Sequence, residues 1–243
     1  MHEHELNITR LVNDHLAGLG NWALGLVGMH QQPRPWANFV VVELLVALII
    51  VVVFALLRMR LSVIAPGKYQ HTFEALYQFL HGETEEQVGH GSGRYLAFFG
   101  TLFIFILFGN LIGIVPGMES PTMAPAVPLG CAVATFLYYH FVGMQAQGVG
   151  KYLVHFAGPM PLLAPLMVPI EIVSHLARPL SLTIRLYANM YAGEQVTLVF
   201  LSLTYFVVPA VFMGLHVFVS LLQAYIFMLL TMMYVAGAVA HDH

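Results

Sequence analysis

The amino-acid sequence predicts an all-α, polytopic membrane protein. Of its 243 residues, 59% are hydrophobic and only 9% are charged, whereas a soluble domain carries about 25% charged residues. The mean hydropathy is +0.79. Several apolar stretches reach the roughly 20 residues that a helix needs to cross a bilayer. The chain therefore has too little polar surface to cover a water-soluble globule.

Residues 1–37 are predicted to form a polar segment outside the hydrocarbon. The opening sequence MHEHELNITRLVNDHLAGLG is acidic, and it lacks both the basic-then-apolar order of a signal peptide and the Arg/Ser-rich character of a transit peptide. We expect the first spanning helix to act as its own insertion signal. The single cysteine, Cys131, excludes an internal disulfide.

Three stretches are predicted to cross the membrane as helices. Residues 38–57 are apolar apart from Glu43, and residues 95–115 contain no charge. Residues 126–145 are less uniform because two tyrosines and a histidine interrupt them. Each stretch has the length that the hydrocarbon core requires.

Two further apolar stretches, 162–203 and 208–240, are too long to stand upright in a bilayer. As single helices they would run roughly 63 Å and roughly 50 Å at about 1.5 Å per residue. They must be steeply tilted, bent or broken, and Pro165, Pro169 and Pro179 offer bends in the first. With a turn near 204–209, the last third is predicted to be a long, tilted hairpin. Residues 38–243 would then form one membrane domain of five spans.

Residues 66–89 are predicted to form an amphipathic helix on the membrane surface. Its apolar residues recur at helical spacing between polar ones, and they are Tyr69, Phe73, Leu76, Tyr77 and Leu80. The acidic end, Glu83 to Glu86, is interpreted as a solvated loop.

The lysines and arginines predict the orientation of the chain. Arg58, Arg60, Lys68 and Arg94 flank the loop between the first two spans, and Lys151 follows the third. The opposite side has only Arg10 and Arg34. The positive-inside rule therefore puts the amphipathic segment in the cytoplasm. With five spans, the N-terminus is expected outside and the C-terminus inside.

A narrow polar stripe is predicted along the fourth apolar stretch. At about 100° per residue, seven polar side chains fall within an arc of about 120°. They are Glu171, Ser174, His175, Arg178, Ser181, Arg185 and Asn189. This stripe must face protein or water, because a charge at mid-bilayer costs at least about 2.5–3.5 kcal/mol.

Arg185 is the most informative member of the stripe, because arginine is effectively never deprotonated. The nearest acid on its face is Glu171, about 21 Å away along the helix. Glu194 lies about 180° round the helix. A partner carboxylate must come from another segment or from another subunit. For Arg178, beside Pro179, extension of the side chain to the membrane surface is the competing interpretation.

The last apolar stretch carries a sparser stripe of His216, Ser220 and Gln223, which can meet the side of the preceding helix bearing Glu194. Glu171, Ser174 and His175 lie at the other end of that helix. Two polar clusters separated by a fixed positive charge indicate proton handling. Purely structural roles, such as interhelical hydrogen bonding by Gln223, are the alternative.

Two other classes of protein compete with this interpretation. A membrane cytochrome could use histidines as haem ligands, although one of them is expected in a loop; the candidates are His140, His155, His175 and His216. A secondary transporter would be expected to show inverted repeats, and the halves of the sequence show none.

The segment RPLSLTIRLYANMYAGE, followed by LLQAYIFMLLTMMY, resembles subunit a of the F-type ATP synthase membrane sector. APGKYQ, NLIGIVPG and PIEIVSHLARPLSL support the resemblance, which covers roughly residues 38–240. It implies a stator subunit that couples proton flow to rotation of the c-ring, in a bacterial inner (plasma) membrane. The implied partners are the c-ring, the peripheral-stalk b subunits, lipid and translocated protons.

The resemblance also implies residue roles. Arg185 matches the arginine that faces the ring carboxylates. The periplasmic half-channel matches Asn189, Glu194, His216 and Gln223; the cytoplasmic half-channel matches Glu171, Ser174 and His90, beside His175. Gln87 stands where some relatives carry an acid, and Ala188 where many carry glycine. The chain has no GxxxxGK[ST] loop, so we expect no bound nucleotide. No cofactor, metal or nucleic acid is expected either, and the chain is not expected to be an enzyme by itself.

Overall fold

The chain is helical throughout its regular structure in the computed structural model, as the composition predicts. The structure describes residues 5–26, 28, 30–59, 61–62, 67–89, 91–115, 117–155, 164–203 and 207–239. Within these ranges four helices are long and apolar enough to cross a membrane. Arg60, His90 and part of the expected turn, residues 204–206, lie outside the described residues.

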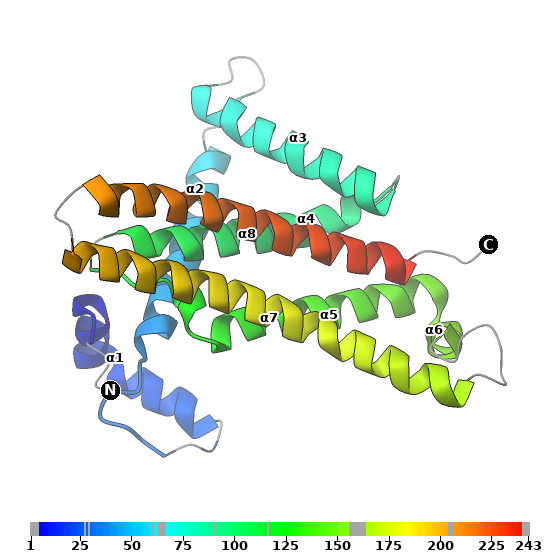
Figure 1. The fold of residues 1–243 in the computed structure, drawn as a ribbon, viewed down its shortest axis with the longest axis horizontal. Helices are drawn as coiled ribbons and strands as arrows, with labels where there is room; N and C mark the ends of the chain where they lie inside the picture. The colour runs from blue at the N-terminus through cyan, green and yellow to red at the C-terminus, as the bar shows by residue number, and fades with distance from the viewer. Residues whose placement is uncertain are drawn as a thin grey trace.

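Ten helical elements follow one another along the described chain. In order they are α1 (Asn7–Leu26), α2 (Asn38–Met59), α3 (Lys68–Val88), α4 (Gly93–Leu111), η1 (Ile112–Ile114), η2 (Pro121–Met123), α5 (Ala126–Gln147), α6 (Val149–His155), α7 (Ala164–Leu203) and α8 (Val207–Val239). Figure 1 shows α7 and α8 side by side along the long axis of the molecule, with α4 and α5 against them.

The four membrane-length helices correspond to four of the expected spans. They are Asn38–Met59, Gly93–Ile114, Ala126–Gln147 and Ala210–Val239. α7 is a single helix of 40 residues that continues through Pro169 and Pro179, so neither proline breaks it. Because charged residues interrupt its apolar sequence, α7 is not among the four, and its role as a fifth span stays a prediction.

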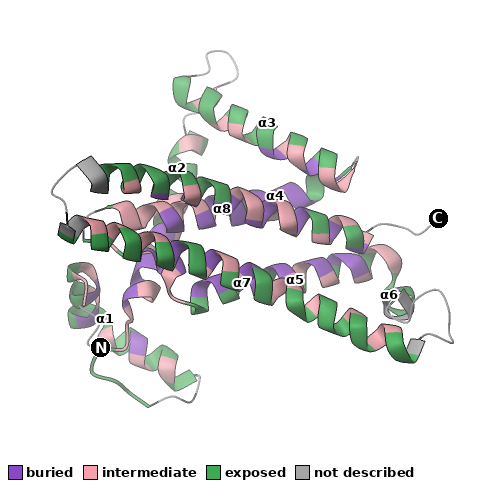
Figure 2. Cartoon of the chain, viewed as in Figure 1, coloured by how far each residue is buried: buried purple, intermediate pink, exposed green. Residues whose placement is uncertain are grey.

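The buried core lies where α4, α5, α7 and α8 meet (Figure 2). Phe99 and Ile106 of α4 contribute to it, together with Leu186 of α7 and Phe227 of α8, all four fully buried. Outside this core, large apolar side chains remain exposed on most helices. Such a surface is typical of a protein whose solvent is lipid.

The amphipathic helix is present as α3, within the expected residues 66–89, but its acidic end is not the loop that the sequence suggested. α3 runs to Val88, so Glu83 to Glu86 are helical rather than a loop. Glu83 accepts a 2.9 Å hydrogen bond from the Tyr225 hydroxyl of α8, which ties this end of α3 to the core. The loop interpretation was wrong because it gave Glu83 no partner on another helix, whereas Glu85 and Glu86 are exposed to solvent as expected.

Two helices were not predicted. α1 occupies much of the segment that was expected only to be polar, and it is kinked at Leu16. α6 continues to His155, where a loop was expected. α6 is short and α1 is interrupted by its kink. Neither contains an apolar stretch long enough to be recognised as a membrane span.

Candidate functional site

The polar stripe of α7 lies along the edge of the helix rather than inside the core. Leu182, Leu186 and Met190 point inward and are almost completely buried. The seven stripe residues are half-buried or exposed, with Ser174, Ser181 and Asn189 in the exposed class. The stripe therefore remains accessible to something outside this chain.

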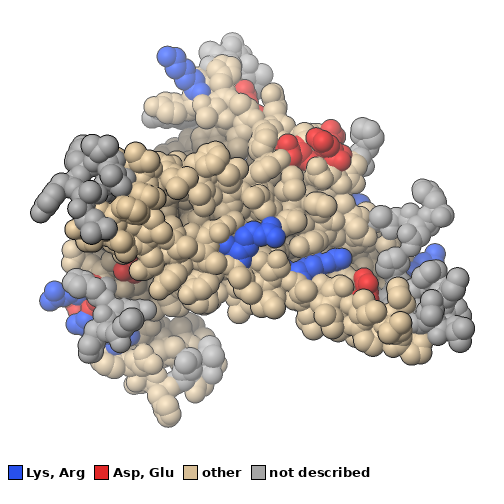
Figure 3. Space-filling model, in the orientation of Figure 1, with Lys and Arg blue, Asp and Glu red and all other residues tan. Residues whose placement is uncertain are grey.

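Arg185 is half-buried near the middle of the stripe. Among the described residues it forms no ion pair. Figure 3 shows the face over α7 and α8 as almost entirely uncharged, with Lys and Arg atoms in small isolated areas. A guanidinium in such an apolar surface requires water or an acidic partner, because burying a lone charge is costly.

Arg178, about two helical turns before Arg185, has a different environment. Its guanidinium carbon lies 5.7 Å from the centroid of the Tyr139 ring and 5.0 Å from that of Tyr234. Both distances suit cation–π contacts. This geometry favours a packed arginine over one that extends freely to the membrane surface.

One polar cluster surrounds His175 on the α5 side of α7. Its Nδ1 forms a 2.8 Å hydrogen bond with the Tyr139 hydroxyl, and its Nε2 lies 3.2 Å from Glu171 Oε1. The His140 ring lies 5.0 Å from the His175 ring, and His140 Nδ1 forms a 2.7 Å hydrogen bond with the Tyr152 hydroxyl. The structure thus connects Glu171 and His175 to three residues that were not predicted as site members.

Two other residues were predicted to belong to the cluster around His175, and the structure does not connect them to it. Ser174 is exposed on the neighbouring surface of α7, and His90 lies outside the described residues. Because both ring nitrogens of His175 already have partners, its use as a haem ligand is unfavourable. That removes one histidine that the cytochrome alternative needs.

A second polar cluster lies between α7 and α8. Asn189 Nδ2 donates a 2.8 Å hydrogen bond to Gln223 Oε1, so the structure brings these two predicted residues together. Gln223 is only 2% exposed. Its Nε2 is buried and has no hydrogen-bond partner among the described residues, which leaves a donor free inside the helix pair.

His216 and Glu194 extend this cluster away from Arg185. A Cβ added to Gly193, the residue before Glu194, would lie 3.0 Å from His216 Nδ1, so α7 approaches the imidazole closely at this point. His216 Nε2 and Glu194 Oε2 are both buried without hydrogen-bond partners among the described residues. Buried polar atoms of this kind are rare in proteins unless water or function accounts for them.

A third group of polar side chains, missed from the sequence, adjoins His216 and Ser220. Asn110 of α4 donates to the Ser220 carbonyl at 3.4 Å, and its Oδ1 accepts from Thr122 Oγ1 at 2.7 Å. Ser120 Oγ bonds Thr122 Oγ1 at 2.7 Å and the Gly109 carbonyl at 2.8 Å. The sequence offered one sign of this group, because Asn110 is a polar residue within an otherwise apolar span.

Glycine makes this approach possible. A Cβ at Gly113 would lie 2.9 Å from Ser120 Cβ and 3.1 Å from Ser120 N. A larger residue would displace the loop that carries Ser120 and Thr122. Gly113 of the NLIGIVPG segment therefore allows the buried hydroxyls to lie against α4.

Together these side chains form two groups of proton donors and acceptors on either side of Arg185. Along α7, Arg185 is about 21 Å from Glu171 and about 14 Å from Glu194 at about 1.5 Å per residue. Carboxyl, imidazole and hydroxyl groups can exchange protons through hydrogen bonds, whereas a guanidinium keeps its proton. Each group thus contains side chains that can exchange protons, and the guanidinium that lies between the groups cannot.

Comparison with known proteins gives one consistent result. A family model described as "ATP synthase A chain" matches residues 40–236. "ATP synthase subunit a" of Solibacter usitatus is 73% identical over 233 residues, covering 96% of this chain and 100% of that protein. The protein of the same name from Koribacter versatilis is 48% identical over 242 residues, covering 99% of each. That from Sulfurihydrogenibium sp. is 38% identical over 202 residues, covering 83% of this chain and 97% of that protein.

Proposed function

Because the chain belongs to the ATP synthase subunit a family, we propose that it is the stator subunit that conducts protons to and from a rotating c-ring. Membership already makes it a non-catalytic, membrane-sector subunit of an ATP synthase. The finer assignments, of individual residues to half-channels and to the ring, are the substance of the proposal.

The environment of Arg185 is the main support for this proposal. Arg185 is half-buried in an apolar face and has no ion pair among the described residues. A carboxylate on the c-ring would supply the missing partner. Each ring carboxylate would pass Arg185 once per rotation of the ring. The permanent charge of Arg185 would also keep protons from passing directly between the two polar clusters.

The cluster of Asn189, Gln223, Glu194 and His216 forms the half-channel from the periplasmic side. The short contact between Gly193 and His216 supports a path between α7 and α8 at this level. Asn110, Ser120 and Thr122 extend it by buried hydrogen bonds. A proton that enters here neutralises a ring carboxylate, which can then face lipid.

The cluster of Glu171, Ser174 and His175 forms the half-channel toward the cytoplasm. Tyr139 joins it through its 2.8 Å bond to His175. We extend the assignment to His90 on the basis of the sequence resemblance alone. A ring carboxyl that reaches this side after almost a full turn releases its proton and is then drawn toward Arg185.

The membrane potential supplies the driving force. Each proton that crosses contributes about 2.3 kcal/mol per 100 mV, and this work turns the ring and drives ATP synthesis elsewhere in the complex. For Arg185 to meet the ring, α7 would lie within the membrane beside α8 as the fifth span. The charge asymmetry of the loops supports a periplasmic N-terminus and a cytoplasmic C-terminus in the bacterial plasma membrane. The b subunits of the peripheral stalk would hold the chain stationary against the ring.

The test is Arg185→Ala in vesicles that contain the complete complex. Proton-driven ATP synthesis should disappear, while the amount of assembled complex remains normal. Ser181→Ala, one turn away and exposed on the same stripe, is the matched control and should retain synthesis. Near-normal coupled synthesis in the Arg185→Ala complex would overturn the proposal.

A further inference from the structure

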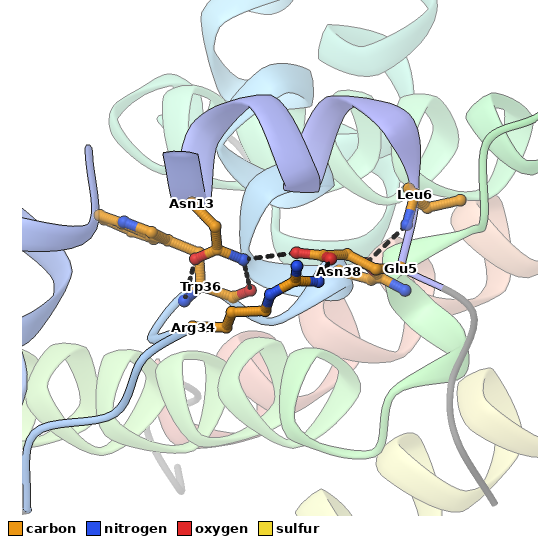
Figure 4. Close-up of polar contacts among 6 residues, drawn as sticks. All are labelled: Glu5, Leu6, Asn13, Arg34, Trp36 and Asn38. Carbon is orange, nitrogen blue, oxygen red and sulfur yellow. Dashed lines mark hydrogen bonds and ion pairs between the residues drawn. The ribbon is translucent and has the colours of Figure 1, made fainter. Parts of the chain in front are cut away.

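The N-terminal helix α1 is attached firmly to the start of α2. The backbone N–H of Leu6 donates to Asn38 Oδ1 at 3.2 Å, and Asn38 is the first residue of α2. Figure 4 shows this bond beside the contacts of Asn13 and the ion pair between Glu5 and Arg34. The position of α1 is therefore fixed relative to one end of α2.

Asn13 and Trp36 clamp α1 to the segment that leads into α2. Asn13 Oδ1 accepts from the Trp36 N–H at 3.0 Å, and Asn13 Nδ2 donates to the Trp36 carbonyl at 3.1 Å and to Glu5 Oε1 at 2.9 Å. The indole Nε1 of Trp36 donates to the carbonyl of Leu16, the residue at the kink, at 2.9 Å. A Cβ at Gly20 would lie 2.6 Å from the Pro35 ring, so glycine permits this close contact.

The face that α1 presents to the rest of the chain is small and polar. Thr9, Asn13 and Gly20 are its buried residues. The large apolar side chains that follow the kink point elsewhere: Leu19, Trp22 and Leu26 are 59–71% exposed. In a water-soluble protein an amphipathic helix buries its apolar stripe against the core. α1 does the reverse, so its apolar face must be covered by something outside this chain.

The position of α1 indicates what covers it. Figure 1 shows α1 at one end of α2 and α3 near the other end. α2 has 22 residues and would be about 33 Å long, close to the thickness of the hydrocarbon core. Its apolar side chains Leu44, Leu48 and Val51 are exposed. The apolar face of α1 thus lies beside a lipid-facing helix at the level where the hydrocarbon ends.

We propose that α1 is an interfacial membrane helix, which lies in the plane of the bilayer surface with its apolar face among the lipid headgroups and upper acyl chains. Such helices bury their apolar face by about 5–10 Å. Trp22 suits this depth because indole rings favour the interface. By fixing α1 to Asn38 and Trp36, the chain sets the depth at which α2 enters the membrane. This inference is independent of the proton path.

The experiment compares a position on the apolar face of α1 with a position on its polar surface. Leu19 and Arg10 are both exposed, but Leu19 follows the kink at Leu16, whereas Arg10 precedes it and shares its surface with the exposed polar residues Asn7, Asp14 and His15. Leu19→Cys and Arg10→Cys are made singly with Cys131→Ala, in a complex whose other subunits lack cysteine. Each is labelled with a nitroxide and reconstituted in phosphatidylcholine–phosphatidylglycerol vesicles. Electron paramagnetic resonance then measures collisions with oxygen, which partitions into lipid, and with a water-soluble nickel chelate.

The label at position 19 should show an oxygen-to-nickel accessibility ratio several times higher than the label at position 10. Equal ratios would place α1 in water and overturn the proposal. Shielding of position 19 from both reagents would also overturn it, because a protein partner would then cover the face. Leu26→Cys, a second exposed position on the same part of α1 as Leu19, repeats the test if Leu19→Cys lowers assembly.

Discussion

Asn189 of α7 and Gln223 of α8 are joined by a 2.8 Å hydrogen bond in which the asparagine amide donates to Gln223 Oε1. Gln223 is almost fully buried, and its own amide donor has no partner among the described residues. Asn189 lies one turn beyond Arg185 and is exposed on the polar stripe. The bond therefore connects the surface that we assign to the ring with the interior of the α7–α8 pair.

Asn189→Ala should destabilise the assembled subunit more than the double variant Asn189→Ala/Gln223→Leu. The single change leaves the side-chain oxygen of Gln223, Oε1, buried without a donor, which costs about 1–3 kcal/mol. Removal of both partners can be nearly neutral. Thermal inactivation of the complex in mild detergent measures the difference. Strictly additive effects in the double-mutant cycle would contradict the hydrogen bond.

Gly193→Val should impair proton conduction by displacing the imidazole of His216. An added Cβ would already lie 3.0 Å from His216 Nδ1, and the branched side chain adds two further methyl groups. Overpacking at this contact forces the imidazole to shift, and a rise of about 1.4 kcal/mol in the barrier to proton transfer lowers the rate about tenfold. We expect ATP-driven acidification of vesicles to fall by about tenfold or more.

Gly214→Val is the matched control, because Gly214 is also helical and exposed, and nothing lies within 4 Å of its added Cβ. This variant should pump protons normally. If both valine variants lose activity equally, the loss reflects helix propensity rather than contact with His216.

Tyr139→Phe should slow proton release to the cytoplasm while leaving coupling intact. The change removes the 2.8 Å bond to His175 but keeps the ring beside Arg178. His175 then keeps Glu171 as a partner but is less constrained in orientation. We expect proton-driven ATP synthesis to fall several-fold, with an unchanged ratio of protons to ATP.

Tyr138→Phe provides the comparison for this prediction. The Tyr138 ring stacks on Phe98 with centroids 3.7 Å apart, and phenylalanine preserves that contact. Its synthesis rate should stay near that of the unaltered complex. A similar loss in both variants would show that the hydroxyl of Tyr139 has no particular role.

The sequence predicts most of the helices because apolar length is a local property. Residues 38–57 and 126–145 were recognised by that signal, and α2 and α5 extend them by only two residues at one end. The stripe on α7 could also be predicted from the sequence, because a periodicity of about 100° per residue can be followed within one helix. Arg185 and Asn189 therefore needed no tertiary information to be placed on a common face.

The contacts that complete each cluster could not be predicted in this way. Tyr139 meets His175 across 36 positions of sequence, and Thr122 meets Asn110 across a turn. Such pairs arise when helices pack, and nothing in either local sequence marks the partner. α1 was missed for a related reason: its leucines are interspersed with glycines and polar residues, and its kink at Leu16 interrupts the periodicity.

The two arginines of α7 should respond differently to lysine. Arg178 lies beside the rings of Tyr139 and Tyr234, and a lysine ammonium can also make cation–π contacts. The exchange should cost on the order of 0.5–1 kcal/mol, so Arg178→Lys is expected to keep most of the proton-driven ATP synthesis.

Arg185→Lys, by contrast, should abolish that synthesis. Arg185 has no ion pair among the described residues, and its proposed role requires a charge that persists after desolvation. A desolvated ammonium can lose its proton, whereas guanidinium stays charged. The neutral amine would then open a direct path between the two clusters.

ATP synthesis and passive proton leak are measured on the same vesicles. ATP synthesis should be lost, and the proton leak should rise. Equal effects of lysine at positions 178 and 185 would contradict the special role of Arg185.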